Sequence, residues 1–196
     1  MQGSKLETAK KAAIAILGTL EERDTASITV FDTEIDLLLG NAAVTAGHKE
    51  RARSLLSEVE ARSSTALHEG WLTGCKSVAS DTPESCNGRL SRCFFLTDGM
   101  ANQGETDQEQ IAAEAADIRS KAGIGTSTFG IGADYNEGLL GPMAVAGGGQ
   151  FHHLRHEEVI VNTFSGELGE MLKAAVREVK LEIEPAEGMD ADLISE

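Results

Sequence analysis

A nearly continuous apolar run, Leu90 to Leu96, is the feature that most constrains how this chain can fold. A strand with one wet face alternates apolar and polar residues, so a run this apolar is typical of a strand covered on both faces. Downstream, the spacing of apolar residues predicts a helix over 106–121, a strand over 125–131, a helix over 136–145, a strand over 149–154 and a helix over 157–176. This alternation predicts an α/β fold with a doubly wound, mostly parallel, Rossmann-like sheet and helices on both faces.

The residues before this run predict further elements of the same layered fold. Apolar positions recur at helical spacing over 5–20, 49–59 and 67–78, and two β-rich runs over 27–31 and 34–39 predict an antiparallel pair that Gly40 closes. Near the other end of the sequence, residues 180–184 alternate before Pro185 breaks the pattern. We therefore expect one α/β domain over 1–177, followed by the start of a β-rich segment or a tail over 178–196.

Charge and hydropathy argue against several classes of function. The 196 residues include 32 acidic and 17 basic side chains, which gives a formal net charge of −15. Nucleic-acid binding needs a basic surface, so we expect no nucleic-acid partner. No run is long and apolar enough to span a bilayer, and the first residues do not resemble a secretory signal. The sequence indicates a soluble protein, with a cytoplasmic location slightly favoured and neither the compartment nor the partner determined.

The apolar run delivers a carboxylate to the place where α/β sheets bind ligands. Asp98 follows Leu96 and Thr97, and Gly99 allows a sharp turn behind it. A carboxylate in this position suits a hard cation, although a turn or helix-capping aspartate has the same sequence pattern. Thr65, just before a predicted helix, is by itself most simply a helix cap. It becomes a candidate metal ligand if the fold brings it close to Asp98.

Several motifs stand in the order and approximate spacing of a known family: Ser63 to Leu67, Phe94 to Gly99, Thr128 to Gly132 and Gly147 to Phe151. With the first helix from Gly3, they make the chain up to about Val176 resemble the von Willebrand factor type A (VWA) domain. The resemblance implies a central first strand that would precede Met1 and is missing here. Many bacterial proteins that resemble this arrangement carry the domain beside β-rich or membrane-attached regions.

The resemblance also implies a metal-ion-dependent adhesion site (MIDAS). In this family Mg²⁺ or Mn²⁺ is held by an Asp-x-Ser-x-Ser motif on the first strand, one threonine and one aspartate, and Thr65 and Asp98 match the last two. The motif itself would lie before Met1, so the site is incomplete in this chain. Mg²⁺ prefers six oxygens in an octahedral array, so we expect weak or absent metal binding. A missing central strand would also leave two strand edges unpaired, which favours self-association.

The expected function is a protein-binding module and not an enzyme. An acidic side chain of a protein ligand would complete the coordination of the ion near Thr65 and Asp98. One alternative is a magnesium-dependent enzyme of the doubly wound class, with Asp32 or Asp134 as a second carboxylate. Another is a metal-free structural or assembly domain. Neither a nucleophile nor a general base is evident, because His68 is expected inside a helix without an acid partner.

The remaining candidate ligands are interpreted as structural. Three histidines fall between positions 152 and 156, but His152 and His153 are neighbours on a predicted strand and should point to opposite faces. The three cysteines are an odd number, which argues against a disulfide framework. Cys93 is expected in the core, and Cys75 could pair with Cys86 only in an exported protein.

Overall fold

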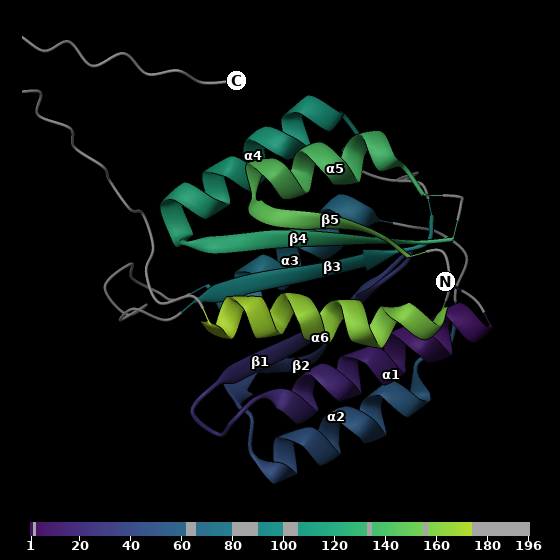
Figure 1. Cartoon of the computed structure of the whole chain (residues 1–196). Helices are drawn as coiled ribbons and strands as arrows, with labels where there is room; N and C mark the ends of the chain where they lie inside the picture. The colour runs from purple at the N-terminus through teal and green to yellow at the C-terminus, as the bar shows by residue number, and fades with distance from the viewer. Residues whose placement is uncertain are drawn as a thin grey trace, which may run out of the picture.

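The structure, a computed structural model, describes residues 1, 3–61, 66–79, 90–99, 106–132, 135–154 and 157–173. Helices and strands follow one another along these ranges (Figure 1). In chain order they are α1 (Ser4–Thr19), β1 (Thr25–Phe31), β2 (Ile35–Ala43), α2 (Ala46–Glu58), α3 (Leu67–Val78), β3 (Ser91–Thr97), α4 (Gln108–Ala122), β4 (Ile124–Ile131), α5 (Glu137–Ala146), β5 (Gly148–Leu154) and α6 (Glu157–Lys173).

The strands form two separate sheets. In the first, β1 and β2 pair antiparallel. In the second, β3, β4 and β5 pair parallel in that order, from Ser91 opposite Ile124 to Thr97 opposite Gly130 in the first pairing. Among the described residues no ladder of hydrogen bonds joins β1 to β3. Parallel strands linked by helices confirm the predicted α/β class with a Rossmann-type sheet.

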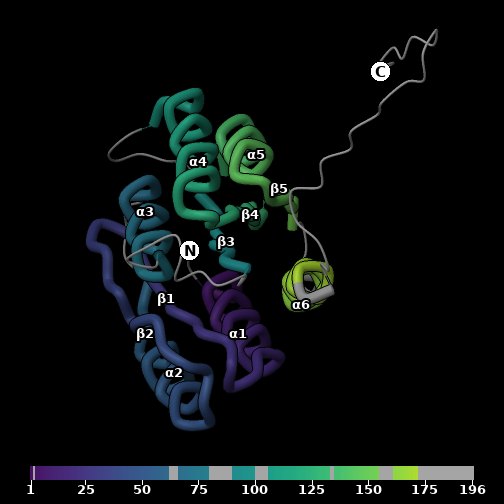
Figure 2. The backbone as a smooth tube through the Cα atoms, turned by 90° about the vertical axis from the view of Figure 1, so that its left-hand side faces the viewer, coloured from purple at the N-terminus to yellow at the C-terminus, as the bar shows by residue number. Residues whose placement is uncertain are grey.

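Helices cover both faces of the parallel sheet. Figure 2 shows α4 and α5 on one side of β3 to β5 and α1 and α6 on the other. On the first side α3, α4 and α5 share an apolar cluster that includes Trp71, Phe95 and Met143. On the second side α1 and α6 share a cluster with Phe129 and Phe164. The central strand β4 is consequently almost fully buried, as expected of a strand with a neighbour on each edge and helices on each face.

The ends of α4 illustrate why these residues form these elements. The Asp107 carboxylate accepts hydrogen bonds from the backbone N–H groups of Glu109 and Gln110, which caps the first turn. Gly123 ends the helix with φ 66°, a left-handed conformation that costs glycine little. Between these caps Ile111 and Ala115 lie one turn apart and are buried. The helix predicted over 106–121 is thus confirmed.

The strand β2 is longer than the sequence predicts. Gly40 was expected to end it, but pairing with β1 continues to Ala43, opposite Thr25. The register shifts between Ala26 and Ile28, whose partners are Ala42 and Leu39, so Gly40 and Asn41 of β2 together lie opposite one residue of β1; a second shift follows between Ile28 and Thr29. A glycine inside a strand commonly marks such a bulge. Gly40 therefore lies in a bulge of β2 and not in a turn that ends the strand.

Two further predictions concern the ends of the chain. The helix α6 is described as far as Lys173, so the boundary at 177 and the strand over 180–184 lie outside the described residues. They stay predictions. Within the described part of the chain no helix combines the length and the apolar character needed to cross a membrane.

Candidate metal site

Asp98 lies at the carboxyl edge of the parallel sheet, where the apolar run predicts it. It directly follows Thr97, the last residue of β3, and 18% of its side chain is exposed. Thr97 is buried, and its hydroxyl accepts a hydrogen bond from the backbone N–H of Gly99 at 3.3 Å. This local hydrogen bond turns the chain away from the strand direction. It leaves the Asp98 carboxylate partly exposed at the carboxyl end of β3.

The other predicted ligand, Thr65, lies outside the described residues. Its neighbour Ala66 donates its backbone N–H to the carbonyl oxygen of Asp32 at 2.7 Å. Since Asp32 follows β1, this bond holds the start of α3 at the carboxyl end of β1. The Asp32 carboxylate accepts a hydrogen bond from the backbone N–H of Glu34 at 2.9 Å. This bond stabilises the turn between β1 and β2. Asp134, the remaining candidate carboxylate, lies outside the described residues.

A positively charged side chain lies beside Asp98. The Lys5 ammonium is 3.9 Å from a carboxylate oxygen of Asp98. Lys5 reaches this place from the first turn of α1 and rests against Gly132, where a Cβ atom would be only 2.8 Å from its nitrogen. Gly132 has φ 82°, so the turn after β4 and the room for Lys5 both require glycine. The sequence pattern gave no sign of this lysine.

The charge of Lys5 opposes a cation at this edge. A divalent cation that binds the Asp98 carboxylate must displace the Lys5 ammonium or tolerate its repulsion. The described residues contain no group of three or more histidine, cysteine or acidic side chains that could hold a metal. Asp98 alone supplies at most two oxygens of the six that Mg²⁺ prefers. Metal binding at this edge needs additional oxygen donors.

The histidines take structural positions, with one correction to the prediction. His68 does have an acid partner: its Nε2 atom lies 2.5 Å from a carboxylate oxygen of Glu114 on α4. Helix spacing could not reveal a partner 46 positions away. His152 bonds to Glu167 on α6, whereas His153 bonds to Tyr135, so the two neighbours point to opposite faces as predicted. These two side chains therefore do not face one another.

A buried polar network that sequence reasoning missed fastens α6 to the sheet. The Glu167 carboxylate, 5% exposed, accepts a hydrogen bond from Ser127 of β4 at 2.5 Å and lies 2.6 Å from the His152 Nε2 atom. The Ser127 hydroxyl in turn accepts a bond from the Arg92 guanidinium at 3.2 Å. The signal was present in the sequence, since Glu167 stands three positions after Phe164 on the apolar face of the helix.

The described cysteines are free thiols, and Cys93, which was expected in the core, is partly buried against the apolar cluster that contains Cys75. Cys75 is buried in α3 and Cys93 lies opposite it on β3. The hydrogen bond that the Cys93 thiol makes to Cys75, the burial of Cys93 and the charge of a neighbouring Cys75 thiolate together raise the pKa of Cys93 well above its ordinary value. Cys86 lies outside the described residues, so its pairing with Cys75 stays untested.

Comparison with known proteins places the chain among longer relatives. No protein-family profile matches it. The uncharacterized protein sll0103 of Synechocystis is 27% identical over 165 residues, which cover 84% of this chain and 37% of that protein. The inter-alpha-trypsin inhibitor heavy chain H1 of Sus scrofa is 25% identical over 187 residues, which cover 93% of this chain and 20% of that protein. The chain thus spans much less than half the length of either relative.

Solved structures share its fold. A von Willebrand factor type A protein from Catenulispora acidiphila superposes with a TM-score of 0.68 at 17% identity, over 82% of this chain and 37% of that one. Proximal thread matrix protein 1 from the mussel byssus, with a zinc-occupied MIDAS motif, superposes with a TM-score of 0.56 at 13% identity, over 83% of this chain and 40% of that one. At these identities the likeness shows the fold alone.

Proposed function

Because this chain has the fold of a von Willebrand factor type A domain, we propose that it is a protein-interaction module that binds Mg²⁺ or Mn²⁺ at the carboxyl edge of β3. Asp98 and Thr65 would each contribute an oxygen ligand. A bound cation there would accept a carboxylate of the protein partner as a further ligand. The zinc-occupied MIDAS motif of the mussel protein supports a metal site on this fold.

The observation that carries this proposal is the position of Asp98. Its carboxylate stands at the end of a parallel strand, partly exposed, at the edge where open α/β sheets bind their ligands. The bond from Ala66 to Asp32 holds the residue after Thr65 at the end of the neighbouring sheet. Both observations support a shared location for the two proposed ligands. An interaction module also fits an edge where the described residues pair no nucleophile with a general base.

The charges around Asp98 determine how strong the binding should be. The Lys5 ammonium lies 3.9 Å from the carboxylate and repels an incoming cation. We therefore expect Mn²⁺ to bind residues 1–196 weakly, with a dissociation constant on the order of millimolar, because two side chains supply few of the six oxygens. Replacing Lys5 by glutamine removes one repulsive charge and should tighten binding about threefold to tenfold.

The test measures free Mn²⁺ by electron paramagnetic resonance while the chain is titrated. Asp98→Ala should abolish specific binding, Thr65→Ala should weaken it, and Lys5→Gln should strengthen it. Asp117→Ala is the matched control, because Asp117 is an exposed carboxylate on α4 that pairs with Lys121. If Asp98→Ala binds Mn²⁺ as well as the unchanged chain does, the metal proposal is wrong. A magnesium-dependent enzyme would instead turn over phosphate esters when Mg²⁺ is present.

A second candidate, a metal-free interaction or assembly domain, is favoured by the position of Lys5. Its ammonium lies 3.9 Å from the Asp98 carboxylate and offsets the negative charge of that carboxylate without an ion. In that case partner binding would not respond to a metal chelator, and Lys5→Gln would weaken the fold at this edge. For either candidate we propose that the domain covers 1–177 and that 178–196 begin a following segment.

A further inference from the structure

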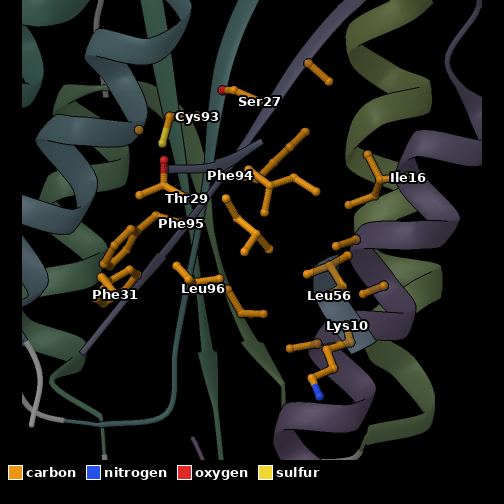
Figure 3. A pocket seen from close by; sticks show the side chains of 18 of the residues that line it. Lys10, Ile16, Ser27, Thr29, Phe31, Leu56, Cys93, Phe94, Phe95 and Leu96 are labelled. Carbon is orange, nitrogen blue, oxygen red and sulfur yellow. The ribbon is translucent and has the colours of Figure 1, made fainter. Parts of the chain in front are cut away.

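Two cysteine thiols meet between α3 and β3. Cys75 lies in the apolar cluster between α3 and the parallel sheet and is 2% exposed, and Cys93 of β3 packs against this cluster. In Figure 3 the Cys93 side chain lies on the same side of β3 as Phe95, whereas Phe94 lies on the other side. Both thiols are free, and the Cys93 thiol makes a hydrogen bond to Cys75. The two sulfur atoms are therefore direct neighbours.

Glycines of α3 bring the helix close to the strands. A Cβ atom at Gly74 would lie 3.7 Å from the Cys93 sulfur, and a Cβ atom at Gly70 would overlap the ring of Phe31. The backbone of α3 thus lies directly against side chains of β1 and β3. A disulfide joins two Cβ atoms that are only about 3.5–4.5 Å apart, so it requires a helix that packs this closely on the strand.

A polar group without a partner lies beside the two sulfur atoms. The Thr29 hydroxyl on β1 is buried and has no hydrogen-bond partner among the described residues. It lies 4.0 Å from the Cβ position of Gly74, the same point that is 3.7 Å from the Cys93 sulfur. In Figure 3 this hydroxyl points toward Cys93. A buried hydroxyl that lacks a partner can donate a hydrogen bond to an oxygen atom that oxidation adds to this pair of sulfurs.

The hydrogen bond between the thiols gives the two sulfurs different roles. This bond, the burial of Cys93 and the charge of a Cys75 thiolate raise the pKa of Cys93, because all three favour its protonated form. Cys93 is thus the donor and keeps its proton, and the Cys75 sulfur accepts. The thiolate is the nucleophile in thiol oxidation, and a hydrogen bond from a neighbouring thiol stabilises it. Cys75 is therefore the sulfur that reacts first, and Cys93 is the sulfur that reacts second.

We propose that Cys75 and Cys93 form a site of reversible oxidation, where hydrogen peroxide converts the two thiols into a disulfide that joins α3 to β3. The Cys75 thiolate attacks one peroxide oxygen and the O–O bond breaks, which gives a Cys75 sulfenic acid and a hydroxide. The hydroxide takes up the proton that Cys75 released and becomes water. Cys93 then attacks the Cys75 sulfur and passes its own proton to the departing hydroxyl group, which leaves as a second water. The two thiols lose two electrons in total, and one peroxide becomes two waters.

The surroundings of the pair favour a small oxidant over other chemistry. Because Cys75 is 2% exposed, a bulky disulfide such as oxidised glutathione does not reach its sulfur, whereas hydrogen peroxide is little larger than water. Structural zinc sites use four ligands, and the described residues bring no third histidine, cysteine or acidic side chain to the two thiols. The proposal is independent of the metal at Asp98. The disulfide would fix α3, which begins at the carboxyl edge of the sheet, to β3, which ends there.

The test uses the positions of the cysteines among the trypsin cleavage sites. Each cysteine falls in its own tryptic peptide: Cys75 in 63–76, Cys86 in 77–89 and Cys93 in 93–119. The full 196-residue chain is reduced, treated with hydrogen peroxide, unfolded in N-ethylmaleimide to block the remaining thiols, and digested for mass spectrometry. We expect 63–76 to be linked to 93–119, with the linked pair two hydrogen atoms lighter than the separate peptides. Dithiothreitol should release both peptides.

Two variants separate this pair from the third cysteine. Cys86→Ala should lose both of its thiols to peroxide and remain a monomer on a non-reducing gel. Cys93→Ala lacks the second sulfur, so its Cys75 should stop at the sulfenic acid, which dimedone labels after unfolding. Circular dichroism checks that both variants fold, and the peptide map of the unchanged chain needs neither of them.

Three results would overturn the proposal. One is a map in which 63–76 is linked to 77–89 and not to 93–119. Another is a disulfide between two chains of Cys86→Ala in place of one within the chain. The third is survival of both thiols of folded Cys86→Ala under a peroxide dose that oxidises the same variant unfolded in urea. That result would mean that the two cysteines only fill the core.

Discussion

Glu167 offers the sharpest test of how the last helix is attached to the sheet. Its carboxylate is 5% exposed and makes short polar contacts with Ser127 on β4 and His152 on β5. Glu167→Ala removes both contacts and leaves the two partners without their acceptor. Glu167→Gln keeps the shape and one acceptor oxygen but loses the charge. The two variants therefore separate the contribution of the charge from that of the contacts.

The magnitude follows from the two contacts. A hydrogen bond to a charged group contributes about 1.5–3 kcal/mol, so two of them give a gross loss of about 3–6 kcal/mol. Relief from burying the carboxylate offsets part of this loss, and we expect Glu167→Ala to lower the free energy of unfolding by about 2–4 kcal/mol. For a chain of this size each kcal/mol lowers Tm by roughly 2–4 °C, which gives a decrease of about 4–16 °C. Glu167→Gln should cost roughly half as much.

Urea denaturation and thermal melting followed by circular dichroism measure both quantities. Glu170→Ala is the matched control, because Glu170 is exposed on the same helix and makes only a 3.4 Å contact with Gln150. A double-mutant cycle with Ser127→Ala should show a coupling energy of at least about 1 kcal/mol. A change below about 0.5 kcal/mol for Glu167→Ala would refute the reasoning, since a surface residue gives that value. It would mean that α6 is held by its apolar face alone.

Two further predictions concern the packing of α3 against β1 and β3. Gly70→Ala should lower the free energy of unfolding by about 1–3 kcal/mol in urea denaturation, because the new Cβ would lie 2.4 Å from the ring of Phe31. Gly18→Ala in α1 is the control. A Cβ at Gly18 has nothing within 4 Å, so this substitution should leave the free energy of unfolding unchanged or raise it. The raised pKa of Cys93, caused first by the hydrogen bond with Cys75 and then by burial, means that the unfolded chain loses this proton at a lower pH than the folded chain does. The contribution of this thiol to stability should therefore be constant below about pH 8.5 and fall above it. The stability of Cys93→Ala should fall less steeply than that of the unchanged chain in melts from pH 7 to 10. An unchanged slope would contradict the assigned pKa shift.

The sequence predicted the helices and strands wherever the burial of an element leaves a local pattern of apolar residues. The apolar run Leu90 to Leu96 and the helical spacing that follows it predicted β3, α4, β4, α5, β5 and α6 in order, because burial on one or two faces leaves a period in the sequence. The same reasoning located Asp98 at a strand end. It failed at Gly40, where pairing with β1 overrode a local turn signal. Residue type alone could not decide between a turn and a bulge.

The tertiary structure decided the contacts between residues far apart in the chain. The approach of Lys5 to Asp98, the pairing of His68 with Glu114 and the burial of Glu167 each join residues from different elements. Such contacts leave no period in a single sequence, because they depend on how whole layers pack. The order β3-β4-β5 in the parallel sheet is of the same kind, since its hydrogen bonds join segments that are far apart in the chain. Local burial patterns thus determine the elements, and only packing determines the charge around the candidate site and the polar contacts of the last helix.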